Sequence, residues 1–126
     1  MTESETDPPG ESLEHLRARA EAGDSEAQCN RGVAYADGRD VPEDPAEAVR
    51  WYRMAAEQGF APGQCSLGMA YDTGVSVPQD PAEGVRLYRL AAEQGYASAQ
   101  YKLGVSCANG RGVPQDDAEA VRLYRL

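Results

Sequence analysis

The segment Ala55-Ala56-Glu57-Gln58-Gly59 recurs unchanged at residues 91–95, an offset of 91 − 55 = 36 residues. A second segment, Val77-Pro78-Gln79-Asp80, recurs 36 residues later at 113–116, and the similar Val41-Pro42-Glu43-Asp44 lies 36 residues before it. Self-similarity at one fixed period is the signature of a repeat protein, in which each unit is a single supersecondary structure. The chain therefore contains three units of 36 residues, at 19–54, 55–90 and 91–126.

The second half of each unit carries the signals of a helix start. In the first unit Asp44 is the expected N-cap, Pro45 suits the first helical position, and Glu47 follows three residues after the cap, which predicts a capping box. Apolar residues then recur with helical spacing, and Gly59 is the expected C-terminal stop because it can adopt a left-handed conformation. We predict these helices, called B helices, over 45–58, 81–94 and 117–126.

The first half of each unit predicts a shorter A helix, over 26–37, 62–73 and 98–109, with Pro62 and Ser98 as start residues of the last two. A glycine in the middle of a helix costs about 1 kcal/mol relative to alanine. Because this cost recurs at equivalent positions, we expect two helices to approach closely there. The positions are Gly32, Gly68 and Gly104. The loop to the B helix is short, which makes the two helices antiparallel.

The ends of the array differ from its middle. Projecting the period backwards predicts a B helix without an A partner over 9–22, polar enough to cap a solenoid, after a disordered acidic tail at 1–8. The last helix stops at Leu126 with no capping helix after it, so we expect its apolar residues to be partly uncovered. They are Val121, Leu123, Tyr124 and Leu126. Self-association through this helix is an alternative function, and a fragment or a designed array is a related explanation.

Composition narrows the choice of partner. The chain has 126 residues and a formal net charge of −9, which repels phosphate backbones and anionic lipid headgroups, so neither nucleic acid nor a membrane is an expected partner. No apolar run approaches the about 20 residues of a membrane helix, and the acidic N-terminus lacks the pattern of a secretory signal. The odd number of cysteines, Cys29, Cys65 and Cys107, argues against a disulfide framework. We therefore predict a cytoplasmic protein.

Residues suited to catalysis are scarce. The only histidine, His15, lies in the polar terminal helix and is expected to be a surface residue. Asp37, Asp40 and Asp44 lie near one loop but miss the order of a calcium-binding loop. No enzyme activity, metal or cofactor is expected. The arginines that follow the B-helix glutamates, such as Arg50 after Glu47, are expected to form ion pairs rather than a basic binding stripe.

Several of the repeated residues resemble the Sel-one-like repeat family, a relative of the tetratricopeptide repeats, over about 19–126. The resemblance lies in Leu67-Gly68, Tyr71, Gly74, Val77, Asp80, Ala82, Tyr88 and residues 91–95. It implies an all-α, right-handed superhelix of stacked helix pairs with the A helices on the concave face, and a scaffold or adaptor role, frequently bacterial. Arg31 departs from the usual leucine, which suggests packing or a salt contact with the terminal helix. Cys107 departs from the usual tyrosine.

The resemblance leaves one enzymatic alternative. Some family members are cysteine-rich, secreted and described as β-lactamase-like, and these pair two cysteines within each repeat. This chain has one cysteine in each unit. We therefore do not transfer their disulfides, and a hydrolase remains the less favoured alternative.

The expected binding surface is the concave face. With Ala27, Arg31 and Tyr35 facing the core, positions 30, 33, 34 and 37 and their equivalents face outwards. These positions are predicted to bind a partner protein or peptide. The candidate residues are Asn30, Asp37, Ser66, Met69, Thr73, Lys102, Val105 and Asn109. Tyr52, Tyr88 and Tyr124 are instead expected to be core aromatics.

Overall fold

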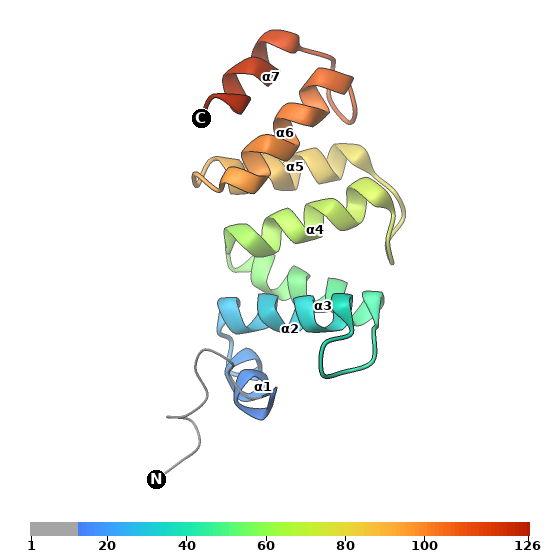
Figure 1. Cartoon of the computed structure of the whole chain (residues 1–126), viewed down its shortest axis with the longest axis vertical. Helices are drawn as coiled ribbons and strands as arrows, with labels where there is room; N and C mark the ends of the chain where they lie inside the picture. The colour runs from blue at the N-terminus through green and yellow to red at the C-terminus, as the bar shows by residue number, and fades with distance from the viewer. Residues whose placement is uncertain (1–12) are drawn as a thin grey trace.

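A computed structural model describes residues 13–126, which form seven α-helices and no strand. The helices are α1 (Leu13–Glu21), α2 (Ser25–Asp37), α3 (Pro45–Glu57), α4 (Ala61–Thr73), α5 (Pro81–Ala92), α6 (Ala97–Asn109) and α7 (Asp117–Tyr124). They stack in chain order into one elongated array, with α1 at one end and α7 at the other (Figure 1). The extensive packing is between consecutive helices, whereas α2 and α4 touch only slightly. The chain is therefore an α-solenoid.

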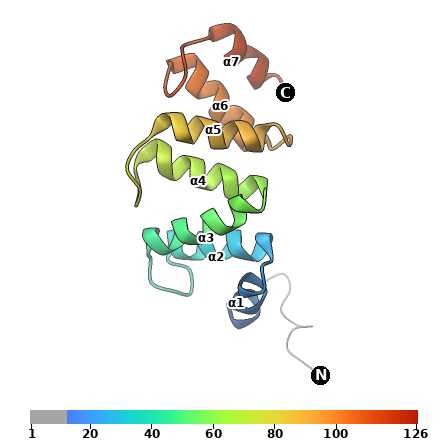
Figure 2. The ribbon, with the colours of Figure 1, turned by 180° about the vertical axis from the view of Figure 1, so that it is seen from behind.

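Six of the seven helices begin and end within two residues of their predicted bounds. The predicted terminal helix at 9–22 corresponds to α1, of which the structure describes Leu13–Glu21. Residues 9–12 and the predicted tail at 1–8 lie outside the described residues. The long loops after α2, α4 and α6 lie along one edge of the array, and the tight turns after α3 and α5 lie along the opposite edge (Figures 1 and 2).

The B helices begin as the sequence predicts, but the capping box is only half formed. Oδ1 of Asp44 accepts a hydrogen bond from the Glu47 amide at 3.2 Å, and the same bond recurs in α5 and α7. The Glu47 carboxylate instead accepts from Arg50, while the Asp44 amide donates to the carbonyl of Tyr35 at 2.9 Å. This backbone bond ties the loop to α2. The predicted starts of α4 and α6 were wrong by one residue, since these helices begin at Ala61 and Ala97.

The three mid-helix glycines mark close contacts, as predicted. A Cβ built on Gly68 would lie 2.9 Å from Cδ1 of Tyr88, and Gly32 and Gly104 face Tyr52 and Tyr124 in the same way. Tyr88 is buried, with 2% of its surface exposed, which confirms it as a core aromatic. Tyr124 is 46% exposed, so the core prediction was wrong there, and the expectation that the end of the array leaves it partly uncovered is confirmed.

Arg31 is buried at a position where the other two units have leucine. Its guanidinium carbon lies 5.1 Å from the centre of the Trp51 ring and 5.3 Å from that of Tyr35. Nη2 of Arg31 donates to the Tyr35 hydroxyl at 3.1 Å. These contacts lie within α2 and with α3, whereas the expected contact was with the terminal helix.

Candidate functional site

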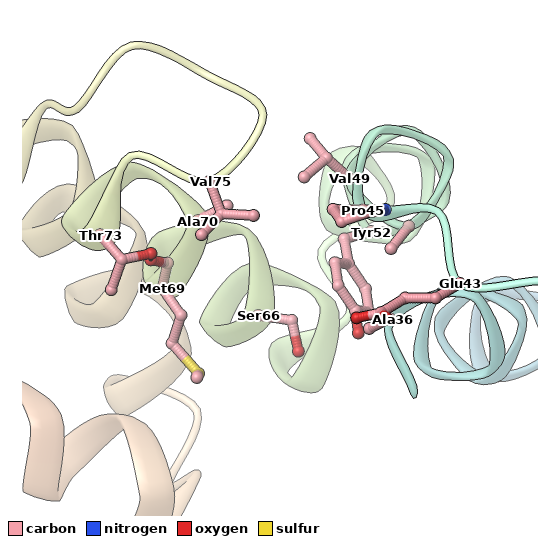
Figure 3. A pocket seen from close by; sticks show the side chains of 11 residues that line it. Ala36, Glu43, Pro45, Val49, Tyr52, Ser66, Met69, Ala70, Thr73 and Val75 are labelled. Atoms are coloured by element: carbon pink, nitrogen blue, oxygen red, sulfur yellow. The ribbon is translucent and has the colours of Figure 1, made fainter. Parts of the chain in front are cut away.

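A groove runs between α2 and α4, and α3 forms its floor (Figure 3). It encloses about 270 Å³. Its lining comes from α3 (Pro45, Ala48, Val49, Tyr52), from α4 (Ser66, Met69, Ala70, Thr73), and from Ala36, Glu43 and Val75 beside them. The groove exists because α2 and α4 pack on the same helix but barely on each other.

The walls of the groove are mostly apolar and partly open to solvent. Met69 is 42% exposed and Val75 is 47% exposed, whereas Val49 is buried. Tyr52 points from α3 into the space between the helices (Figure 3), and its burial raises the pKa of its phenol to about 12, so the hydroxyl stays protonated. Glu43 is the one charged residue of the lining. An apolar cleft with a single carboxylate at its edge suits the insertion of apolar side chains.

Three of the eight predicted site residues come together in this groove. Ser66, Met69 and Thr73 line its α4 side, where Oγ1 of Thr73 donates to the Met69 carbonyl at 2.8 Å. The other five do not line it. Asn30 and Asp37 are exposed on α2, Asn109 is exposed at the end of α6, and Lys102 and Val105 are half-buried on α6.

One position of the predicted outward face belongs to the core instead. Ala34, Ala70 and Ser106 are all buried, because this position turns towards the neighbouring B helix rather than towards solvent. The predicted core stripe of the first A helix is confirmed for Ala27 and Arg31, while Tyr35 is half-buried.

Half of the groove is supplied by α3 and the loops, and the sequence pattern does not indicate it. The pattern marks Pro45 as a helix start and Tyr52 as a core aromatic, and neither role predicts a groove. Ala36 and Val75 line the groove from two different units and at positions that are not equivalent in the repeat, so a comparison at the 36-residue period does not connect them.

The described residues offer little for catalysis. Within 13–126 no group of three or more His, Cys, Asp or Glu side chains is placed to hold a metal ion. The three cysteines are free and buried, and burial raises the pKa of the Cys29 thiol to about 11. His15 was expected to be a surface residue, and the structure shows it half-buried on α1.

The first set of repeated arginines in the B helices forms the predicted pairs, whereas Arg53 of the second set donates to the Tyr71 hydroxyl at 3.0 Å instead. Arg50 contacts Glu47 at 2.5 Å, and the equivalent pairs Arg86–Glu83 and Arg122–Glu119 lie at 2.7 and 2.5 Å. The hydrogen bond from each arginine lowers the pKa of its glutamate. Since each pair is one turn apart on one exposed helix face, these residues stabilise their own helices and do not form a free basic stripe.

The face of α6 and α7 at the end of the array is partly apolar and exposed. Val121 is 45% exposed, Leu126 is 67% exposed and Tyr101 is 62% exposed, and the Tyr101 ring lies 5.8 Å from that of Tyr124. Leu123, expected to be uncovered, is buried, so that prediction was wrong.

A model of the Sel1 repeat matches residues 25–60, 61–96 and 97–126, which is most of the chain. The chain belongs to the Sel1 repeat family. Each matched unit starts at an A helix, so the phase differs from the units at 19–54, 55–90 and 91–126 while the period is the same. Sel1 repeat proteins are helical scaffolds and generally not enzymes. None of the described helices is long and apolar enough to cross a membrane.

Solved structures share this architecture. The Sel1-like repeat protein c5321, a protective antigen of uropathogenic Escherichia coli strains, is 42% identical with a TM-score of 0.86, over 90% of this chain and 24% of its own. A Sel1 repeat protein from Oxalobacter formigenes is 33% identical with a TM-score of 0.84, over 98% and 51%. The present chain therefore spans about a quarter and about half of these two proteins.

A more distant structure shares the fold alone. The cysteine rich protein B of Helicobacter pylori is 18% identical with a TM-score of 0.69, over 92% of this chain and 89% of its own. A search of curated protein sequences finds no match to the chain.

Proposed function

We propose that this Sel1 repeat chain is an interaction scaffold that holds a segment of a partner protein in the groove between α2 and α4. The observation that carries the proposal is the apolar groove itself, with Met69 and Val75 exposed on one side and Tyr52 on the other. Exposed methionine adapts to different partner side chains because its chain is unbranched and polarisable. The scaffold character of Sel1 repeat proteins supports the same function.

The dimensions of the groove favour a peptide over a small molecule. Sites for drug-sized ligands enclose about 300–1,000 Å³ and place several polar groups around the ligand. This groove is smaller, at about 270 Å³, and is open along one side. One or two side chains of a longer segment fit such a space, while the rest of the segment lies along the array. The net charge of −9 further favours a protein over a nucleic acid.

The test is affinity capture with a groove variant and a matched control. Met69→Glu places a charge in the apolar groove, whereas Ser98→Glu adds the same charge on exposed α6 outside it. We expect a partner to be captured by the wild type and by Ser98→Glu but not by Met69→Glu. Equal capture by all three forms would show that the partner binds elsewhere.

We further propose a cytoplasmic location, supported by three free thiols that an oxidising compartment would not protect. A hydrolase has less support, because burial raises the pKa of the three thiols and so keeps them protonated and unreactive near neutral pH. Turnover of the chromogenic β-lactam nitrocefin would restore that alternative.

Self-association is a second proposal, supported by the exposed apolar residues Val121, Tyr124 and Leu126. A second copy of the chain would cover this face with its own apolar residues. Light scattering over a wide concentration range tests it, with Val121→Glu as the variant expected to remain monomeric. A wild type that stays monomeric throughout would reject this proposal and leave the groove proposal intact.

A further inference from the structure

The groove between α2 and α4 has a counterpart one repeat later, between α4 and α6, and a salt bridge crosses that counterpart. The residues that stand 36 positions after Ala36 and Val75 are Asp72 and Arg111. Nε of Arg111 donates to Oδ1 of Asp72 at 2.6 Å, and Nη2 of Arg111 donates to the Asp72 carbonyl. Where the first groove has two small apolar side chains facing open space, the second has an ion pair joining α4 to the loop after α6.

Further substitutions tighten the second position around this pair. The Tyr88 hydroxyl donates to Oδ2 of Asp72 at 3.3 Å, so the carboxylate is held on both oxygens. Gly84 stands where the first unit has Ala48, and a Cβ there would lie 2.9 Å from the Gly68 carbonyl. Half-buried Lys102 stands where the groove has Ser66. The repeat therefore builds the same seam twice, and an ion pair crosses the second seam at the positions where the first has Ala36 and Val75.

The rim of the open groove is acidic. Glu43 lines it, Asp44 follows directly, and Asp40 belongs to the same loop, and all three are exposed. Arg39, the one cation of this loop, pairs with Asp37 of α2 at 3.2 Å. Within the described part of the chain, no lysine or arginine lies within ion-pair distance of Glu43 or Asp40. No lining residue is basic. The residues equivalent to Glu43 are Gln79 in the second unit and Gln115 in the third. The negative charge of Glu43 is therefore particular to this groove.

We propose that the α2–α4 groove takes a basic segment of a partner protein, which inserts one or two apolar side chains between Tyr52 and Met69 and places a lysine or arginine beside Glu43. The Arg111–Asp72 pair closes the equivalent position of the next repeat, so the array holds this segment in one register. This inference rests on the proposed function and adds the chemistry of the partner and the reason for a single site.

The decisive variant moves the closing pair into the open groove. Ala36→Asp with Val75→Arg places at the first seam the two residues that already pair at the second. Ala36 is half-buried and Val75 is exposed. The matched control is Asp72→Ala with Arg111→Val, which removes the pair from the second seam and leaves the first groove unchanged. Circular dichroism and melting temperature establish that both variants fold. A third variant, Glu43→Gln, introduces the residue found at the equivalent positions.

The probe is a random peptide library displayed on phage and selected against the immobilised wild-type chain. We expect enriched peptides to combine an apolar residue with lysine or arginine, to bind the control variant as they bind the wild type, and to bind the closed variant at least about tenfold more weakly. Glu43→Gln is expected to weaken binding of the basic peptides and to reduce its dependence on salt.

The outcomes separate the two proposals. Enriched peptides that bind the closed variant as well as the wild type would overturn this inference, while leaving a scaffold that binds elsewhere. Enrichment of acidic peptides, or equal affinity for Glu43→Gln, would overturn the assignment of a basic partner. Failure to enrich any peptide would count against both the inference and the proposed function.

Discussion

The ring of Tyr88 lies against the Cα of Gly68, so that a Cβ at residue 68 would be 2.9 Å from both Cδ1 and Cε1 of the ring. The same Cβ would lie 3.1 Å from the carbonyl oxygen of Gly84. Real Cβ atoms do not approach other atoms so closely without displacing them. The glycine therefore sets the distance between α4 and α5, and the repeated glycine and tyrosine set the same distance in each helix pair.

Gly68→Ala is expected to destabilise the chain despite the better helix propensity of alanine. Propensity alone would stabilise the helix by about 1 kcal/mol, whereas overpacking a filled core typically costs 1–3 kcal/mol. Because Tyr88 is 2% exposed and has little room to move, we expect overpacking to outweigh propensity, with a net loss of about 1 kcal/mol. Urea unfolding followed by circular dichroism measures this difference.

Gly104→Ala is the matched comparison, because its tyrosine has room to move. A Cβ there would lie 2.7 Å from Cε1 of Tyr124, but Tyr124 is 46% exposed. We expect the ring to rotate outwards, leaving a change within about 0.5 kcal/mol of the wild type. An equal loss in both variants would mean that freedom of the ring does not decide the cost.

The array could be predicted from the sequence because its determinants are local and repeated. Asp44 with Pro45 starts a helix, Gly59 ends one, and the period of 36 residues multiplies these signals. The groove could not be predicted in the same way, since it depends on which side chains meet between units. Comparing equivalent positions hides the contact of Asp72 with Arg111, because the two residues come from different units and from different positions in the repeat.

Arg31 shows a second limit of pattern analysis. Its equivalents are the buried Leu67 and Leu103, so the repeat predicts an apolar residue in the core, and the structure buries the arginine anyway. The stabilising partners are the rings of Trp51 and Tyr35. Trp51 also departs from the leucine of the other units. The two departures compensate each other in space, which becomes apparent only when α2 and α3 are placed side by side.

Arg31→Leu is expected to raise the stability of the chain by about 1–2 kcal/mol, because replacing a buried charge by a well-packed apolar residue is often stabilising. Nε of Arg31 is buried without a hydrogen-bond partner among the described residues, which adds a desolvation cost that leucine removes. Thermal unfolding compares the two proteins. Arg31→Lys serves as the control, since it keeps the charge but loses the planar stacking on Trp51, and should be less stable than the wild type. A lower melting temperature for Arg31→Leu would show that the cation–π contacts outweigh the cost of burial.

Ser76→Gly is expected to stabilise the loop before α5. Ser76 has φ of 64°, in the left-handed region, and the equivalent residue of the next unit is Gly112 with φ of 78°. A non-glycine residue in this region costs roughly 1–2 kcal/mol, part of which is offset by the greater freedom of glycine in the unfolded chain. We expect a net gain of about 0.5 kcal/mol in urea unfolding. The reverse change, Gly112→Ser, should destabilise strongly, because its Cβ would collide with the carbonyl of Pro81. Similar small effects from both changes would show that the loop adjusts its backbone freely.

The three buried thiols should be protected from reaction and should make stability depend on alkaline pH. Burial raises the pKa of Cys29 from 9.0 to about 11, and raises the pKa of Cys65 and Cys107 as well. Below pH 9 the Cys29 thiol is protonated in both the folded and the unfolded chain, so it adds no pH dependence. Between pH 9 and about 11 it ionises only when the chain unfolds, which favours the unfolded state, and stability should therefore fall as pH rises through this window.

A thiol reagent such as dithiobisnitrobenzoate should label the native protein slowly at pH 8 and label all three cysteines rapidly in guanidinium chloride. The reason is that the thiolate is the reacting species, and the native thiols are both protonated and covered. Rapid labelling of the native chain would mean that α2, α4 or α6 opens readily, and a melting temperature that does not change from pH 8 to 10 would argue against the raised pKa of Cys29.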